Sequence, residues 1–203
     1  MKVLLAGACL LAAVSSASAL PRLAHLAPIS LNAGVNRIPH FMPDGRDAQI
    51  IRAWRENGNA HGYEVFLILA PTKRGASDWN VVGFDRGKSF DDEITYAPHS
   101  GEDVSQAIRF VWTSQHGKRT PLVVKAVRNI ETSYADPSVT TITVYSLRKS
   151  DGVFGTTTDY FAILKEWKAG MRYCNAELAL RDEVGLALRS DYAGPKTADG
   201  CYR

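Results

Sequence analysis

The sequence predicts an α+β fold in which mainly antiparallel sheet packs against helices. Runs rich in β-branched and aromatic residues recur along the chain, as expected of strands. Short links rich in turn residues separate these runs and favour antiparallel pairing, since a parallel return needs a crossover of about a dozen residues or more. Two segments with apolar residues at helical spacing each precede three such runs. The predicted order is therefore helix, three strands, helix, three strands, helix.

The N-terminal nineteen residues have the pattern of an export signal. Lys2 precedes an apolar run over residues 3–14, and residues 15–19 end in an A-x-A cleavage site. The run is too short to cross a hydrocarbon core, which needs about twenty residues. Cys9 offers an alternative site of lipidation, but the apolar run continues beyond it. We expect a signal peptide over 1–19 and a soluble periplasmic or secreted protein without an integral membrane segment.

Charge excludes two classes of partner. Removing the signal peptide takes away only Lys2, so the formal net charge falls from +3 to +2. That balance supplies neither a basic field for nucleic acid nor a polybasic patch for a membrane surface. The expected partner is therefore a protein, a peptide or a small ligand.

Two cysteines remain after removal of the signal, Cys174 and Cys201. An even pair in an exported protein predicts one disulfide, which ties the C-terminal tail to the body of the protein. The alternative is a metal-binding or redox pair, but the sequence has no C-x-x-C motif and no histidines grouped near either cysteine.

The domain organisation follows from these features. Residues 20–42 carry three prolines and no sustained period, so we expect residues 20–43 to form an extended lead-in with an edge strand at residues 29–31. The remainder, 44–203, is expected to form a single α+β domain. Its candidate parts are one half over 44–99, a second half over 100–170, and a C-terminal helix with a disulfide-tied tail over 171–203.

The first half opens with a predicted helix. Asp44 is placed as its N-cap, and Gly58 suits its C-terminal end. Ile50, Ile51 and Trp54 form one apolar stripe between them, so Trp54 is expected in the core. Strands are then predicted over residues 63–70, 79–84 and 90–97.

The second half repeats this order. A capping pattern at residues 100–103 and an apolar stripe that includes Val104, Ile108, Val111 and Trp112 predict a helix that ends at Gly117. The predicted strands that follow are 122–127, 139–147 and 160–167, and a final helix fits residues 176–184 behind Asn175.

The similar placement of Trp54 and Trp112 suggests an internal duplication. The alternative is that any amphipathic helix leading into a strand shows tryptophan, isoleucine and glycine at such places.

No motif for catalysis, a metal or a cofactor is complete. Residues 83–89 resemble a P-loop but have three residues rather than four between their glycines, which favours a hairpin turn. No G-x-S-x-G elbow occurs. His61, His99 and His116 are candidate ligands or bases, yet they lie in turns without a metal-binding spacing. The acidic triplet at 91–93 alternates between the two faces of a strand, so it forms no carboxylate pair.

Tryptophans are the best candidates for a binding surface. Trp79 and Trp167 lie at strand ends beside charged neighbours, outside the predicted helical stripes. The sequence therefore predicts an exported non-enzymatic binding or accessory protein, with its site at Trp79 and Trp167 and with no cofactor. The alternative is a small periplasmic hydrolase that uses a histidine and a carboxylate.

Signal cleavage gives the first testable prediction. N-terminal sequencing of protein exported by a bacterial host is expected to begin Leu20-Pro21-Arg22. A mature chain that begins at a lipidated Cys9 would show that the A-x-A site is not used.

Overall fold

Twelve strands and one helix form the described part of the chain, which in this computed structural model is residues 26–59, 61–87, 89–99, 103–115, 117–152 and 157–202. The predicted signal peptide lies outside it. The elements are β1 (Ala27–Pro28), β2 (Gly34–Ile38), β3 (Ala48–Arg55), β4 (Tyr63–Pro71), β5 (Trp79–Val81), β6 (Gly83–Asp85), β7 (Phe90–Asp91), β8 (Glu93–His99), β9 (Asp103–Gln115), β10 (Lys118–Asn129), β11 (Ser138–Lys149), β12 (Asp159–Tyr173) and α1 (Ala176–Val184).

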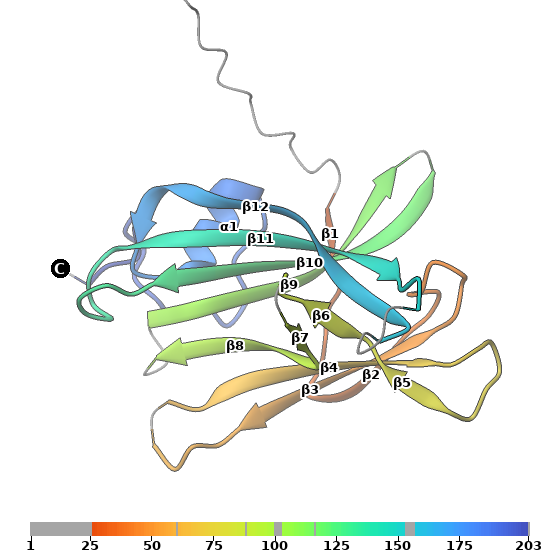
Figure 1. Ribbon diagram of the computed structural model, residues 1–203. Helices are drawn as coiled ribbons and strands as arrows, with labels where there is room; N and C mark the ends of the chain where they lie inside the picture. Colours follow the sequence, from red (N-terminus) through yellow and green to blue (C-terminus); the bar gives the residue numbers. More distant parts are fainter. Residues whose placement is uncertain are drawn as a thin grey trace, which may run out of the picture.

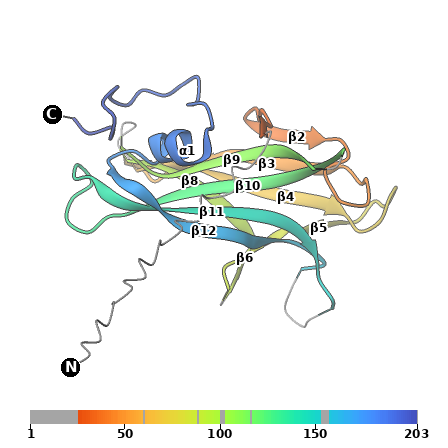
Figure 2. The same ribbon diagram turned by 90° about the horizontal axis from the view of Figure 1, so that it is seen from above.

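All the strands belong to one hydrogen-bonded sheet with the order β2-β3-β4-β8-β9-β10-β11-β12-β6-β7, to which β1 adds on β9 and β5 on β4. The pairing is antiparallel except between β12 and β6. Figures 1 and 2 show this sheet folded over into two layers, with β9–β12 in one layer and β2–β5 in the other. Strand β8 connects the layers, since it pairs with β4 on one side and with β9 on the other.

The inner faces of the two layers enclose the main core. Ile50 and Ile68 from one layer and Phe110 and Phe161 from the other are at most 4% exposed. Phe84 of β6 stacks on Phe161 with ring centroids 5.2 Å apart. This aromatic packing holds the short β6–β7 hairpin against the start of β12.

A second core lies on the outer face of β9, β10 and β11, where α1 covers it. Asn175 caps the helix by accepting a hydrogen bond from the amide of Glu177 at 3.0 Å. Glu177 is itself 1% exposed, and its carboxylate receives both terminal nitrogens of Arg109 from β9. A buried bidentate ion pair therefore fixes the helix on the sheet.

The described part of the chain has one helix rather than three, so the predicted α+β class is wrong: the fold is mostly β-sheet. The segment around residues 48–55, predicted as the first helix, is strand β3. Asp44 does not cap a helix; its side chain accepts from the amide of Arg46 at 3.2 Å within a turn. Gly58 has a φ of +68° in the turn between β3 and β4, so its left-handed conformation belongs to a hairpin.

The second predicted helix is strand β9, and its capping pattern at residues 100–102 lies outside the described part of the chain. Ile108 and Trp112 face the inner core, whereas Val104 and Val111 face the outer core. A strand buried on both faces thus has apolar residues at helical spacing by coincidence.

The duplication hypothesis fails together with the helices on which it was based. Trp112 is 8% exposed on β9, but Trp54 is 55% exposed on β3, so the two residues are not equivalent. The strands that follow them also differ in arrangement, because β9–β12 pair in sequence order, whereas β4 pairs with β3, β5 and β8.

Several predicted elements are confirmed. The last helix has the predicted bounds, and each of the six predicted strand segments forms strands, two of them divided in two. The edge strand expected at residues 29–31 does not form there; instead, the two-residue strand β1 just before it pairs with β9. The lead-in also contains β2 and two core residues, Phe41 and Met42, which the proline content did not indicate. None of the described helical segments is long and apolar enough to cross a membrane.

The predicted disulfide is confirmed: Cys174 and Cys201 are bonded, with Cα atoms 5.0 Å apart. The amide of Cys174 also donates to the carbonyl of Asp199 at 2.8 Å. Farther from the bridge, Arg189 pairs with Glu64 of β4 at 2.9 Å. The tail is therefore held by a covalent bond and by polar contacts.

Removal of the disulfide is expected to be tolerated at a cost. Replacing both cysteines (Cys174→Ser with Cys201→Ser) should lower the free energy of unfolding by about 3.5 kcal/mol or less, because the bridge closes a short loop. Urea unfolding of the oxidised wild type and the double variant measures this difference. Equal stabilities would show that the bridge contributes nothing to the fold.

Lys125 is an exception to the apolar inner face. It follows Val123 by two residues on β10 and so lies on the same inner face. It lies opposite Ile108 and Thr143 on the neighbouring strands and is 4% exposed. Among the described residues its ammonium group has no hydrogen-bond or ion-pair partner. Burial and the positive charge of Arg86 lower the pKa of Lys125 to about 8, and Asp91 only partly opposes this shift.

This lysine predicts a pH dependence of stability. The folded protein holds the proton of Lys125 less tightly than the unfolded chain, so stability should rise between pH 8 and 10.5 and remain fully reduced below this window. Lys125→Met should add about 3 kcal/mol at neutral pH and remove the rise. Urea unfolding across this pH range measures both effects, with Lys118→Met as an exposed control on the same strand. An unchanged rise in Lys125→Met would assign it to other groups.

Candidate functional site

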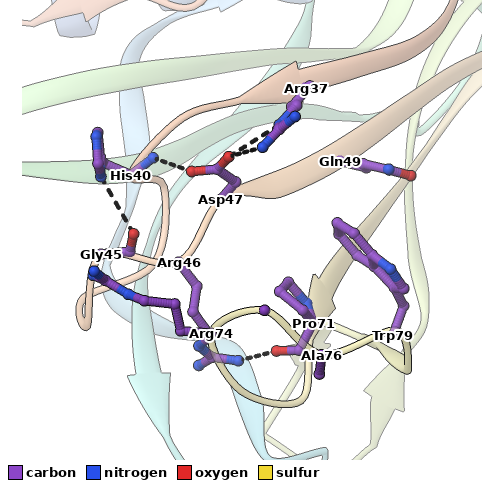
Figure 3. A pocket seen from close by; sticks show the side chains of 11 residues that line it. Arg37, His40, Gly45, Arg46, Asp47, Gln49, Pro71, Arg74, Ala76 and Trp79 are labelled. Carbon is purple, nitrogen blue, oxygen red and sulfur yellow. Dashed lines mark hydrogen bonds and ion pairs between the residues drawn. The ribbon is translucent and has the colours of Figure 1, made fainter.

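A cleft of about 440 Å³ lies beside strand β5, and we call it the arginine cleft (Figure 3). It is formed by the β2–β3 turn, the start of β3 and the β4–β5 turn. The lining residues used below are Arg37, His40, Arg46, Asp47, Arg74 and Trp79.

Trp79 stands at the edge of a tight connection. It begins β5 and lies opposite Pro71, the last residue of β4. The turn between them is closed by a hydrogen bond from the amide of Thr72 to the carbonyl of Asp78 at 2.9 Å. The indole of Trp79 remains 39% exposed, so a large apolar ring faces solvent in a fixed position.

Arg46 is the buried, ion-paired arginine of the cleft. It is 6% exposed and pairs with Asp159 at 2.8 Å and with Asp44 at 2.7 Å. It also donates to the carbonyl of Pro71. Burial opposes the charge of Arg46, but these acceptors outweigh it and raise its pKa. Arg46 therefore connects β12 with the ends of β3 and β4, and its charge is compensated.

Arg37 and Arg74 present charge to the cleft. The Arg37 side chain is 75% exposed and makes two hydrogen bonds to one oxygen of Asp47, at 2.9 and 2.7 Å. Arg74 is exposed and donates to the carbonyl of Asp44 at 3.3 Å. Gly45 permits this approach, since its φ is +81° and an added Cβ would lie 2.8 Å from the Arg74 guanidinium. Asp47 is the one carboxylate among the described lining residues, and it pairs with Arg37.

His40 is held in an unfavourable backbone conformation. Its φ of 53° is the one positive value among the described non-glycine residues. The Asp47 carboxylate accepts its amide at 3.1 Å, and that hydrogen bond together with Arg37 lowers the pKa of Asp47. The imidazole Nδ1 lies 3.3 Å from the carbonyl of Gly45 rather than from a carboxylate. The histidine side chain thus has a partner that suits positioning rather than general-base catalysis.

The two predicted binding tryptophans have different surroundings. Trp79 lines the arginine cleft, whereas Trp167 of β12 packs against the outer core beside α1. Its indole donates to Glu183 at 3.3 Å, and the Lys165 ammonium lies 5.4 Å from the centre of its ring. Trp167 therefore covers the core and is not part of this site.

The histidine and acidic candidates are not brought together. His61 lines another cleft, His99 ends β8, and His116 lies outside the described residues. Asp91 pairs with Arg86 at 2.6 Å in the β6–β7 hairpin, which confirms the hairpin predicted there. No group of three metal-binding side chains occurs within the described ranges.

Sequence reasoning missed Arg37, His40 and Arg74. Arg37 and His40 come from the lead-in that was expected to be irregular, and Arg74 comes from a turn more than thirty residues later in the chain. Trp79 was the one residue of the cleft whose sequence context indicated a surface role.

Comparison with known proteins identifies a solved structure with a similar fold. No protein-family model matches the sequence, and no curated protein matches it. A solved structure titled "Crystal structure of CarG" is similar, with a TM-score of 0.62, 17% sequence identity, and coverage of 77% of this chain and 94% of that chain. At this identity the likeness concerns the fold alone, so this chain has the sheet architecture of CarG.

Proposed function

We propose that this protein is an exported binding protein that takes a small anionic ligand in the arginine cleft. The observation that supports this most is that an exposed indole, Trp79, and two exposed guanidinium groups, Arg37 and Arg74, line the same cleft. Guanidinium groups bind carboxylates and phosphates through parallel hydrogen bonds, and an indole face accepts a flat apolar group. The ligand would carry a carboxylate or phosphate next to a planar ring.

Two features support export and binding rather than catalysis. A disulfide is typical of proteins that fold in an oxidising compartment. Within the cleft, the imidazole of His40 lies next to the backbone carbonyl of Gly45, and Asp47 accepts hydrogen bonds from Arg37. A rigid cationic cleft of this kind suits retention of a ligand.

Titration with benzoate and phenyl phosphate tests this proposal, with benzyl alcohol as the neutral control. Both anions should raise the melting temperature of the wild type, and benzyl alcohol should not. Trp79→Ala and Arg74→Gln should each weaken binding by about tenfold or more, because each removes one of the two contacts. Trp54→Ala, which alters an exposed tryptophan outside the cleft, should bind as the wild type does.

Two results would contradict the proposal. One is an equal response to benzyl alcohol and the two anions. The other is a loss of function in the native host on changing His99 or His116 to alanine, with Trp79→Ala unaffected, which would favour the hydrolase.

A further inference from the structure

We propose a second ligand site, for a neutral glycan, in a cleft at the other end of β4. This aromatic cleft has a volume of about 490 Å³, within the range of small-molecule sites. The lining residues on which the proposal depends are His61, Tyr63, Thr95, Ser105, Gln106 and Tyr134. They come from the β3–β4 turn, β4, β8, β9 and the loop between β10 and β11.

The chemistry of this lining differs from that of the arginine cleft. Among the described lining residues there is no carboxylate, lysine or arginine. Two phenol rings, an imidazole, an amide and two aliphatic hydroxyls remain. Aromatic faces pack against the C–H face of a sugar ring, and amides and hydroxyls both donate to and accept from its hydroxyl groups. A neutral polyhydroxylated ligand fits this set better than an ion does.

The polar floor of the cleft keeps hydrogen-bonding capacity. Thr95 donates to the amide oxygen of Gln106 at 3.3 Å, which orients the side chain of Gln106. No hydrogen bond of the Gln106 amide nitrogen to another described residue is present. Ser105 donates to the carbonyl of Ala97 at 2.8 Å, so its oxygen remains available as an acceptor.

Neighbouring arginines contact the segments that carry both aromatic walls. Arg128 is 3% exposed and donates to the carbonyl of Tyr134 at 2.7 Å and to that of Asp136 at 2.9 Å, which fixes the loop under a ring that is 44% exposed. On the opposite wall, the guanidinium of Arg55 lies 5.2 Å from the centre of the Tyr63 ring. Ordering of these segments before binding lowers the conformational entropy that is lost when a ligand binds.

The turn that carries His61 is also ordered by its own side chains. Asn57 donates to the carbonyl of His61 at 2.7 Å, and Asn59 accepts the amide of His61 at 2.8 Å. The indole of Trp54 packs directly over Gly62, where an added Cβ would collide with it. Trp54 pairs with Glu64, so it lies on the face of the hairpin opposite to Tyr63, where it covers Gly62 and does not line the cleft.

Calorimetric titration with cellohexaose, chitohexaose and maltohexaose tests the proposal. We expect at least one of these to bind the wild type, and Tyr63→Ala and Tyr134→Ala to weaken that binding by about tenfold or more. Tyr134→Phe, which keeps the ring, should bind nearly as the wild type does. Trp79→Ala and Tyr202→Ala serve as matched controls, because they remove aromatic groups that do not line the cleft.

The outcomes separate this site from the arginine cleft. Absence of binding by all three sugars, or binding that both tyrosine-to-alanine variants leave unchanged, overturns the proposal. Loss of sugar binding in Trp79→Ala alone also overturns it, since the sugar would then occupy the other cleft. Thermal unfolding of each variant is measured first; if Tyr63→Ala does not fold, Tyr134→Ala on its surface loop decides the result.

Discussion

Burial of strands β9, β10 and β11 on both faces is the constraint on which the rest of the structure depends. Their inner faces meet the other layer of the folded sheet, and their outer faces meet α1. Each strand must therefore be apolar on both sides, and the outer side needs a cover. The buried pair of Arg109 and Glu177 keeps that cover in register with the sheet, and it stays buried only because each charge has its partner.

The folded sheet also determines where the two clefts lie. Its interior is filled by aromatic side chains, so the two clefts form where turns meet the ends of strands. Strand β4 spans nine residues, from Tyr63 in the aromatic cleft to Pro71 in the arginine cleft, a length of about 27 Å. A single rigid strand thus separates a cationic site from a neutral one.

Local signals predicted part of this structure. Asn175 predicted the last helix, and in the structure it is the N-cap, while Gly185 in a left-handed conformation ends the helix. The paired cysteines gave the disulfide. The helical predictions over β3 and β9 failed because the spacing of apolar residues reports which positions are buried, not which secondary structure buries them. The apolar positions of β9 contact two cores on opposite sides of one strand. For the arginine cleft, Trp79 had a visible surface context, but Arg37 and Arg74 meet only through the pairing of distant strands, which no local pattern encodes.

The short parallel pairing of β6 with β12 leaves most of one edge of β12 without a neighbouring strand in the described chain. Strand β12 runs to Tyr173, but within the described chain β6 pairs with it only at Tyr160 and Phe161. The remaining backbone groups on that side form an edge that a strand of another molecule can join. Lys165 and Lys168 place charges along this edge, and two register shifts against β11 make it irregular. The sequence of β12 thus combines a hydrogen-bonding edge with features that protect the protein from aggregation.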